Sequence, residues 1–325
     1  MNSPLAKNFA ALLEAAKGRK LAVAGHMRPD GDCVGSQFAL AEILEAAGAD
    51  VVCVNRDEIP YLYANFCDKP FLPADSLGEE RDIVLVDCSD LSRVSPALAA
   101  RNPRIFACVD HHASGDSKAR INVIDIRAGA TAEIIALCAS ELGLNISAKS
   151  ANLLYVGLAT DTRQFTTSST RPESFEAARA LLGFGADANY AAQQLYQRER
   201  APKMRLLSEY LASLKMFGGG KICVGFIPLG TFERTGSRKE DTDGLVDFAR
   251  SIEGVEIAAT LEELAGGSVK GSLRGRNPRY RVDEVAAAFG GGGHFAAAGF
   301  TAHNETFETI LPKLLGLFES SLERK

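Results

Sequence analysis

Short apolar runs alternate with helical patterns over the first half of the chain. The runs are rich in valine, isoleucine and leucine, with few polar interruptions. Such runs between helices are typical of parallel strands that are buried on both faces of a sheet. We therefore expect an α/β domain in which helices flank a parallel sheet. Strands are predicted at residues 21–25, 51–55, 83–87, 105–110 and 121–125, and helices at 34–48 and 131–143.

The second half of the chain has a different pattern. The apolar spacing is helical from about residue 149 to 217, and FGGG at 217–220 is expected to form a hinge or turn. Beyond it, strand and helix patterns predict a smaller α+β domain that ends in a helix near 305–319. A chain of 325 residues also exceeds what one hydrophobic core usually supports. We predict an N-terminal domain over 1–185, a helical connector over 186–216, a C-terminal domain over 217–325, and an active-site cleft between the two domains.

Composition and charge narrow the classes of function. The apolar fraction of 46% and the charged fraction of 24% are ordinary for a soluble globular protein. A net charge of -5 leaves no global basic field to bind long duplex nucleic acid, although a short nucleotide remains open. The seven cysteines form no CxxC pair, which favours a reducing compartment. The N-terminus does not resemble a signal peptide and no apolar stretch could span a bilayer, so we expect a cytoplasmic protein without a membrane partner.

Acidic and histidine side chains gather at the ends of the predicted strands. Ligands bind at this edge of parallel sheets. Each residue alone has an ordinary explanation, because acidic surface turns, helix caps and helix-terminal acceptors are common. Two adjacent histidines beside an aspartate are harder to explain structurally, since the chain has only five histidines. The candidates are His26, Asp30 and Asp32 after the first strand, Asp87 at the third, Asp110, His111 and His112 at the fourth, and Asp161 ending a helical segment.

Together these groups indicate a metal site, because four separate segments deliver them to one crevice. Carboxylates at this concentration repel one another strongly unless cations are present. Carboxylate oxygens suit hard divalent ions, and imidazole suits manganese, iron, cobalt or zinc. The set is large enough for two ions that share a bridging carboxylate. Such a pair clamps a phosphate and lowers the pKa of a bridging water.

A further cluster lies downstream, in GSLRG (271–275) and FGGGGHFAAAGF (289–300). Consecutive glycines expose backbone amides and let a phosphate or base approach closely. Arg274 could pair with a phosphate through two hydrogen bonds, and His294 could hydrogen-bond the same ligand. The alternative is a flexible loop followed by a tightly packed Ala/Gly helix.

The motifs GHMRPDGD, LVDCSD, VDHHAS and ATDTRQF, in that order, resemble those of the DHH phosphoesterase superfamily. GSLRG and GGGGHFAAAG resemble its DHH-associated C-terminal domain, which binds substrate. The resemblance covers nearly the whole chain. The compact size is most similar to the NrnA group of bifunctional oligoribonucleases and phosphatases of 3′-phosphoadenosine 5′-phosphate (pAp).

The resemblance implies a role for each candidate residue. The N-terminal domain would be the DHH metal-binding catalytic domain, and the C-terminal one would bind substrate. Two positions depart from the family pattern: Arg163 replaces a frequent glycine, and Phe295 replaces a residue that is often polar or basic. His26, Asp30 and Asp87 would hold one metal, and Asp32, Asp87, His111 and Asp161 the other, with Asp87 bridging. His112 would contact the scissile phosphate or assist the leaving group, Asp110 would support it, and Arg274, Gly292, Gly293 and His294 would grip the far end of the nucleotide.

The expected function is a two-metal hydrolase that acts on short oligoribonucleotides (nanoRNA), on pAp, or on both. Two divalent cations are expected, manganese first because imidazole is mixed with carboxylates, with magnesium, cobalt and iron as alternatives. A second enzymatic hypothesis is a phosphodiesterase for cyclic dinucleotides or their linear products. A third is a catalytically silent nucleotide-binding regulatory protein, against which the complete ligand set argues. Related proteins are often dimers, which leaves a homodimer open.

Overall fold

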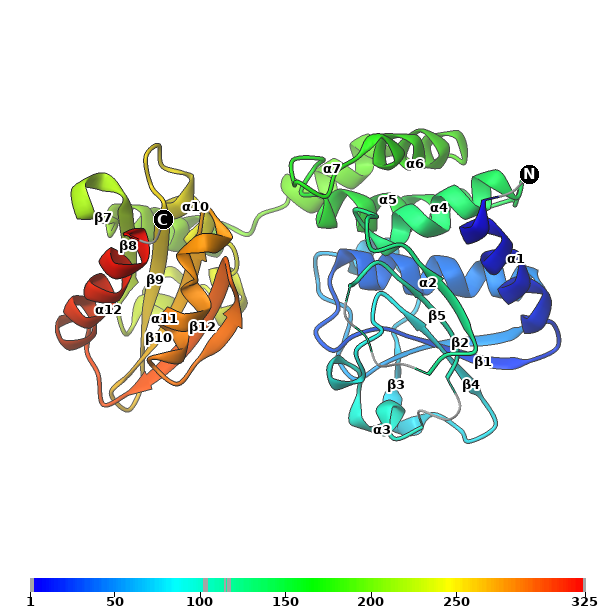
Figure 1. Cartoon of the computed structure of the whole chain (residues 1–325), viewed down its shortest axis with the longest axis horizontal. Coiled ribbons are helices and arrows are strands. Elements are labelled where there is room, and N and C mark those ends of the chain that lie inside the picture. Colours follow the sequence, from blue (N-terminus) through cyan, green and yellow to red (C-terminus); the bar gives the residue numbers. More distant parts are fainter. Residues whose placement is uncertain (1–2, 102–104, 114, 116–117, 324–325) are drawn as a thin grey trace. The chain divides into compact units, whose positions relative to one another are not determined.

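The computed structural model of the chain describes residues 3–101, 105–113, 115 and 118–323. The chain divides into two compact units, Met1–Arg198 and Glu199–Lys325 (Figure 1). Within the described ranges, every helix is too short or too polar to cross a membrane. The predicted limits of the domains and of the connector, and the cleft between the domains, stay predictions.

The first unit contains a parallel sheet of six strands in the order β3-β2-β1-β4-β5-β6. The parallel sheet expected from the apolar runs is therefore confirmed, and one short edge strand, β3, is added to it. The strands are β1 (Lys20–Ala24), β2 (Asp50–Asn55), β3 (Leu72–Pro73), β4 (Asp82–Val86), β5 (Ile105–Asp110) and β6 (Ile121–Ile124).

Helices cover both faces of this sheet, as the uninterrupted apolar strands require. Alternate residues such as Leu21 and Val23 face the larger core, which α1, α2, α4, α5 and α6 complete. The intervening residues, such as Ala22, face a smaller core that includes Leu98 of α3. The helices are α1 (Pro4–Ala16), α2 (Gly31–Ala46), α3 (Pro96–Ala99), α4 (Thr131–Glu141), α5 (Ala148–Asp161), α6 (Pro172–Gly183) and α7 (Ala188–Tyr196).

Helix α2 begins earlier than the residue 34 that we predicted. Asp30 precedes its first residue, Gly31, and the Asp30 side chain accepts a hydrogen bond from the Cys33 amide at 3.0 Å. This N-cap satisfies an amide that otherwise has no partner in the first turn. The acidic motif therefore lies on the N-terminal turn of a helix rather than on a loop ahead of it.

Glycines let α2 and α5 approach closely. A Cβ atom on Gly35 of α2 would lie 2.2 Å from the carbonyl oxygen of Leu153 in α5. A Cβ atom on Gly157 of α5 would lie 2.7 Å from Oδ1 of Asp32. Any larger residue at either position would separate the two helices that carry Asp32 and Asp161.

The second unit is built on a mixed sheet of six strands in the order β11-β12-β10-β9-β8-β7, in which only the β8–β9 pair is parallel. This confirms the smaller α+β domain. The strands are β7 (Lys215–Phe217), β8 (Ile222–Ile227), β9 (Ile257–Leu264), β10 (Ser268–Gly275), β11 (Gly292–His294) and β12 (Ala297–His303). The helices are α8 (Ala201–Ala212), α9 (Thr231–Thr235), α10 (Leu245–Ser251), α11 (Val282–Ala287) and α12 (Phe307–Leu322).

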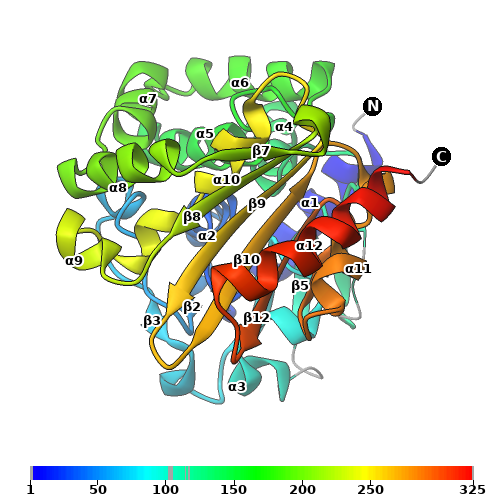
Figure 2. The same ribbon diagram turned by 90° about the vertical axis from the view of Figure 1, so that its left-hand side faces the viewer.

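Each face of this second sheet packs against a different pair of helices. Leu273 and Phe300 face the core completed by α11 and α12, and Figure 2 shows α12 laid across the strands. Cys223 and Ala258 face the opposite side, where α8 and α10 pack. The glycine run leads into the β11–β12 hairpin, so the alternative of an Ala/Gly helix at this point is wrong.

Candidate active site

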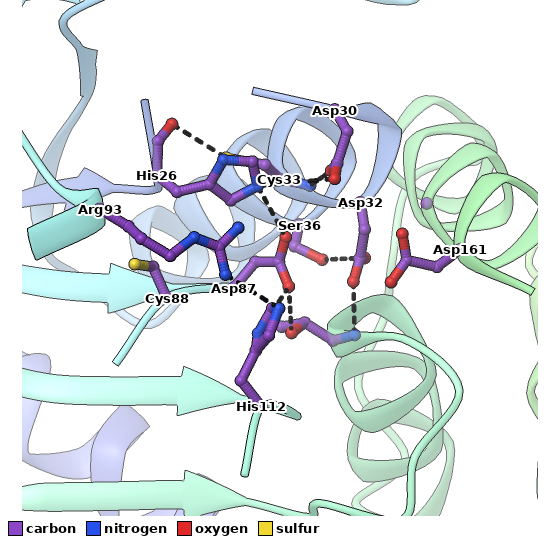
Figure 3. A network of polar contacts seen from close by, with 12 residues as sticks. His26, Asp30, Asp32, Cys33, Ser36, Asp87, Cys88, Arg93, His112 and Asp161 are labelled. Atoms are coloured by element: carbon purple, nitrogen blue, oxygen red, sulfur yellow. Dashed lines mark hydrogen bonds and ion pairs between the residues drawn. The ribbon is translucent and has the colours of Figure 1, made fainter. Parts of the chain in front are cut away.

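The strand order of the first sheet places its ligand-binding edge at one defined point. β1 pairs with β2 on one side and with β4 on the other, so the order of the chain reverses there. At such a switch point a crevice opens beyond the carboxyl ends of the strands. His26 follows β1, Asp87 follows β4, and His111 follows β5. Figure 3 shows the side chains of His26, Asp87 and Asp161 in one cluster. His111 belongs to the same cluster, because its Nε2 lies 3.3 Å from Oδ2 of Asp161 at the end of α5.

Asp87 lies at the centre of the cluster. Its backbone φ of 55° is unusual for a residue other than glycine, although aspartate and asparagine tolerate this region best. The Asp87 amide donates to the carbonyl oxygen of Val109 at 3.0 Å, and Thr131 Oγ1 donates to Oδ1 at 3.0 Å. Asp87 Oδ2 lies 3.4 Å from Nε2 of His26, and Oδ1 lies 3.5 Å from Nε2 of His111. One buried carboxylate thus faces both imidazoles.

The two imidazoles are oriented by backbone carbonyls. Nδ1 of His26 lies 2.9 Å from the Met27 oxygen, and Nδ1 of His111 lies 3.0 Å from the Ala128 oxygen. Each Nδ1 therefore donates its proton to a carbonyl, so that in the neutral imidazole the lone pair is on Nε2. Both Nε2 atoms are buried and lack a hydrogen-bond partner among the residues that the structure describes. A carbonyl that orients the far nitrogen is a common support for metal-binding histidines.

Asp32 is buried completely but is supported by several donors. The amides of Thr131 and Ala132, at the start of α4, donate to its two oxygens at 2.6 and 2.9 Å. Ser36 Oγ donates to Oδ1 at 2.9 Å. These contacts with the positive end of a helix favour a carboxylate in this position. Asp161 lies nearby, with Oδ2 at 3.3 Å from Nε2 of His111.

Asp30 completes the set at the more exposed side of the cluster. Its Oδ2 lies 3.6 Å from Nε2 of His26, and half of its side chain is exposed. The structure therefore brings together all six predicted metal ligands. They are His26, Asp30, Asp32, Asp87, His111 and Asp161.

The pKa shifts within the cluster reflect the close spacing of its charged groups. Burial raises the pKa of Asp32 to about 7, and the carboxylate of Asp161 adds to this shift. Burial also raises the pKa of Asp87 well above its usual value, and Asp32 adds to that shift. Burial alone would lower the pKa values of His26 and His111, but neighbouring groups, above all Asp30 and Asp161, raise them to about 11 and about 10. Without cations, the cluster has to retain protons to limit its repulsion.

The arrangement fits divalent cations. Among the described residues, three groups of donors have ligand atoms within 4.8 Å of one another. Two bare Nε2 atoms, crowded carboxylates and this spacing are the features that a bound cation would satisfy. The groups are His26, Cys33 and Asp87; Asp87, His111 and His112; and Asp32, His111 and Asp161.

His112 differs from the other two histidines because both of its ring nitrogens have partners. Nδ1 lies 2.7 Å from Oδ1 of Asp110, and Nε2 lies 3.2 Å from Nη1 of Arg93. A guanidinium can only donate, so Nε2 accepts and Nδ1 carries the proton. Asp110 also accepts from the His111 and His112 amides at 2.7 and 3.1 Å, which holds this turn in place.

Arg93 is a residue that we did not expect at the site. It lies in LSR (91–93), after the LVDCSD motif, and its carbonyl oxygen accepts a hydrogen bond from the Met27 amide at 2.8 Å. No sequence signal distinguishes it from other loop arginines. Its position next to His112 depends on how two loops meet in the folded chain (Figure 3).

A largely buried ion network formed by Asp125, Glu133 and Arg171 was also missed by the sequence predictions. Glu133 is fully buried and accepts from Arg171 Nε at 2.7 Å, from Ser174 Oγ at 2.6 Å and from the Gly129 amide at 3.1 Å. Arg171 Nη2 also donates to Asp125 at 2.8 Å. The network ties α6 to residues 125–130, the loop whose Ala128 carbonyl orients His111. The sequence did contain one signal for this network, because Glu133 interrupts the apolar pattern of α4.

In the second unit, strand register brings two of the four predicted substrate residues, Arg274 and His294, into one row. Arg274 of β10 pairs with Ala297 of β12, which pairs with His294 of β11. Directly paired residues point to the same face of a sheet, so Arg274 and His294 project on the same side with only a methyl group between them. In the next row, Ser272 pairs with Gly299 and Gly299 with Gly292, which leaves the floor almost free of side chains.

The structure also describes the surroundings of three further positions that the sequence analysis singled out: Gly293, Arg163 and Phe295. A Cβ atom on Gly293, whose φ is 148°, would lie 2.6 Å from the Ala297 oxygen, so the hairpin requires glycine there. Arg163 follows α5 with a φ of 45°. Phe295 is exposed, and the guanidinium carbon of Arg281 lies 4.3 Å from its ring centroid.

The fold and the candidate site together define the class of protein. Its first domain is a parallel α/β domain with a cluster of aspartates and histidines, and its second is a mixed-sheet domain with a glycine- and histidine-containing hairpin. The chain carries an N-terminal domain of the DHH family and a DHHA1 domain. The N-terminal domain of the DHH family matches residues 20–158, and the DHHA1 domain matches residues 218–321.

Several characterised or solved proteins are similar over nearly the whole chain. A bifunctional oligoribonuclease and PAP phosphatase NrnA from Thermus thermophilus is 28% identical over 318 residues, which cover 97% of this chain and 94% of the relative. The NrnA of Bacillus subtilis is 24% identical, with 86% and 88% covered. An exopolyphosphatase-related protein from Bacteroides fragilis superposes with a TM-score of 0.85 at 24% identity, covering 98% of this chain and 95% of that one. The exonuclease RecJ bound to manganese, at a TM-score of 0.53 and 17% identity, covers 99% and 95% and shares the fold.

Proposed function

We propose that the protein is a two-metal phosphoesterase that hydrolyses short oligoribonucleotides, pAp, or both. The observation that carries the proposal is the convergence of six aspartate and histidine side chains from four segments at the switch point of the sheet. The NrnA relatives, which align with most of the chain, support the choice of substrates. The acidic net charge and scattered cysteines support a cytoplasmic enzyme that does not bind long duplexes. The oligomeric state is left open between a monomer and the homodimer that is frequent among related proteins.

The proposed cation positions share Asp87. His26 and Asp30 would complete one, and Asp32, His111 and Asp161 the other. Manganese is the proposed ion because the set mixes imidazole with carboxylates, and a solved relative of the same fold was bound to manganese. When bound, the ions supply positive charge opposite the phosphate oxygens and make the attacking water more acidic.

Arg93 is proposed to bind the scissile phosphate, and His112 is proposed to protonate the leaving oxygen. Arg93 can turn from His112 to a phosphate oxygen and donate two parallel hydrogen bonds. That movement frees Nε2 of His112, which can then receive a proton and donate it toward the leaving oxygen. Asp110 holds the opposite nitrogen at 2.7 Å and stabilises the charged imidazole that forms. Both side chains are partly exposed, so a substrate can reach them.

The row of Arg274 and His294 is proposed to bind the remote phosphate of the nucleotide. Both residues can donate to phosphate oxygens, and the small floor of Ala297, Gly299 and Gly292 lets a ribose or base lie flat against the sheet. This surface would select for substrate length, because it recognises a group away from the reacting phosphate.

The direct test is hydrolysis in the presence of Mn²⁺. We expect phosphate release from pAp, and mononucleotides from labelled RNAs of two to five nucleotides, with the shortest RNAs cleaved fastest. The Asp87→Asn protein serves as the control for contaminating nucleases. A purified protein that releases nothing from either substrate class, with any of Mn²⁺, Mg²⁺, Co²⁺ or Fe²⁺, would exclude the proposed activity.

A further inference from the structure

The thiol of Cys33 lies inside the candidate metal centre. Cys33 is in the first turn of α2 and is completely buried. Its Sγ atom, a ring nitrogen of His26 and a carboxylate oxygen of Asp87 lie within 4.8 Å of one another. Figure 3 shows Cys33 beside His26, with its amide bonded to Asp30. The metal-ligand roles proposed above use aspartate and histidine only, and they leave this sulfur without a function.

Neighbouring residues fix the position of the Cys33 thiol, but the thiol makes only weak hydrogen bonds with them. A Cβ atom on Gly25 would lie 2.3 Å from Sγ, so the missing side chain of Gly25 makes room for the sulfur. The contacts of Sγ are long: 3.5 Å to Oε1 of Gln37 and 3.9 Å to the His26 carbonyl oxygen. A thiol is a weak donor, and these contacts need no particular residue at position 33.

A second observation points independently to a ligand. Nε2 of His26 is buried and lacks a hydrogen-bond partner within the described ranges, although Nδ1 is held by the Met27 carbonyl. A ring nitrogen of the same imidazole belongs to the triplet that contains Sγ, and Nε2 is the nitrogen that lies 3.4 Å from Oδ2 of Asp87, the third member. Ligand bonds to zinc are about 2.0–2.3 Å long, so ligand atoms of one ion lie at most roughly 4.6 Å apart. The spread of the triplet is therefore close to that of a single coordination sphere.

We propose that Cys33 is a thiolate ligand of the cation position formed by His26 and Asp87. Sulfur and imidazole prefer Zn²⁺, Co²⁺ or Fe²⁺, whereas Mg²⁺ and Mn²⁺ prefer oxygen. The second position, with Asp32, His111 and Asp161, offers only oxygen and imidazole nitrogen. The two positions are then unequal: the Cys33 position selects a softer ion, and the other takes a harder one. This inference rests on the proposed two-metal function and specifies the metals that it uses.

The first test reads the metal–sulfur bond directly. Co²⁺ added to the metal-free protein gives a thiolate-to-cobalt charge-transfer band in the near ultraviolet only when sulfur binds the ion. We expect this band in the wild type and in Cys138→Ala, a variant of another buried cysteine of the same unit, and expect it to be lost in Cys33→Ala and Cys33→Ser. Identical cobalt spectra for the wild type and Cys33→Ala would overturn the proposal.

A measurement without variants covers the case in which Cys33→Ala does not fold. X-ray absorption at the zinc edge of the protein with one equivalent of Zn²⁺ should show one sulfur neighbour at about 2.3 Å. A shell of nitrogen and oxygen alone would overturn the assignment.

Metal affinity then separates this inference from the proposed activity. We expect Cys33→Ser to weaken Zn²⁺ binding by at least the ~10–100-fold typical of residues that support a metal site, and to change Mn²⁺ binding by much less. Equal losses for both ions, or no loss, would count against a soft position. If Mn²⁺-dependent hydrolysis persists while the cobalt–sulfur band is missing, only the role of Cys33 fails. If no hydrolysis occurs with any ion, the proposed function fails.

Discussion

The two units of the chain hold their functional side chains in opposite ways. In the first unit the candidate ligands are packed into the protein, with Asp32 and Asp87 only 0% and 1% exposed. Helix ends, strand ends and a left-handed backbone at Asp87 hold them in place. In the second unit Gly292, Gly293 and His294 are exposed, and only the register of a hairpin aligns them with Arg274.

This contrast indicates that the two units have different functions. Burying a carboxylate costs several kcal/mol per charge, and hydrogen bonds to Asp32 and Asp87, together with bound cations, would offset this cost. Such a site is suited to chemistry, because its dipoles and ions are already in position before substrate arrives. A row of one partly buried arginine with an exposed histidine and glycine costs little to maintain and is suited to binding. The first unit should therefore control turnover, and the second should control substrate affinity.

The largest expected effect belongs to Asp87. Asparagine accepts the left-handed backbone and keeps the shape of the side chain, so Asp87→Asn should fold normally. It removes the charge that both imidazoles face, and we expect turnover to fall by at least ~10³-fold, equivalent to about 4 kcal/mol. Steady-state kinetics on pAp, with circular dichroism as the folding control, measure this. A folded Asp87→Asn protein with normal turnover would remove the distinction between the units.

Metal removal should have the next largest effect, and only the first unit should respond. Adding Mn²⁺ to the chelated protein at about 100 times its dissociation constant should stabilise the folded state by ~2.7 kcal/mol. Thermal unfolding with and without Mn²⁺ measures this gain. Asp161→Asn should reduce it, whereas Arg274→Ala should leave it unchanged. An equal loss in both variants would mean that the two regions do not act separately on the metal.

The sequence was sufficient to predict the parts of the site that depend on strand ends. Each of His26, Asp87 and Asp110 comes at the end of an apolar run, and parallel strands carry such residues to one edge. The strand expected at 105–110 was found as Ile105–Asp110. The order of the motifs then indicated the family, which the domain matches confirm.

The remainder depends on tertiary contacts that no local pattern encodes. Arg93 is an ordinary loop arginine until its loop meets His112. Strand β3 has two residues, too few to produce a periodicity. The alignment of Arg274 with His294 follows from register across β12, and a slip of one residue would turn one of them to the other face. Individual roles at the site accordingly stay predictions, whereas the fold class is confirmed.

A smaller effect, on affinity, is expected at Arg274. A hydrogen bond between charged groups contributes about 1.5–3 kcal/mol, so Arg274→Ala should raise KM for a dinucleotide by roughly 10–150-fold. The value of kcat should change little, because the residue binds away from the reacting phosphate. The matched control is Lys313→Ala in α12, a cation on the opposite side of the same sheet. A selective fall in kcat would instead show that Arg274 takes part in the catalytic step. The second unit would then not be limited to substrate binding.

The smallest effect concerns the ion network that supports the first unit without touching the cluster. Burial tends to raise the pKa of Asp125, but hydrogen bonds from the Arg127 amide and from Arg171 outweigh it and hold this pKa below its usual value. A carboxyl group with a lowered pKa stabilises the folded state above its unfolded-state pKa of about 3.9, and this contribution is lost as the pH falls through the folded-state pKa.

Asp125→Asn should therefore lower the free energy of unfolding at pH 7, and the difference from wild type should shrink as the pH falls below ~4. Urea unfolding at several pH values, monitored by circular dichroism, gives this difference. At neutral pH, kcat should fall only modestly, since Arg171 retains Glu133 and still anchors the loop that orients His111. A pH-independent loss of stability would show that Asp125 acts through packing rather than charge. A loss of turnover as large as that of Asp87→Asn would extend the catalytic centre beyond the buried cluster.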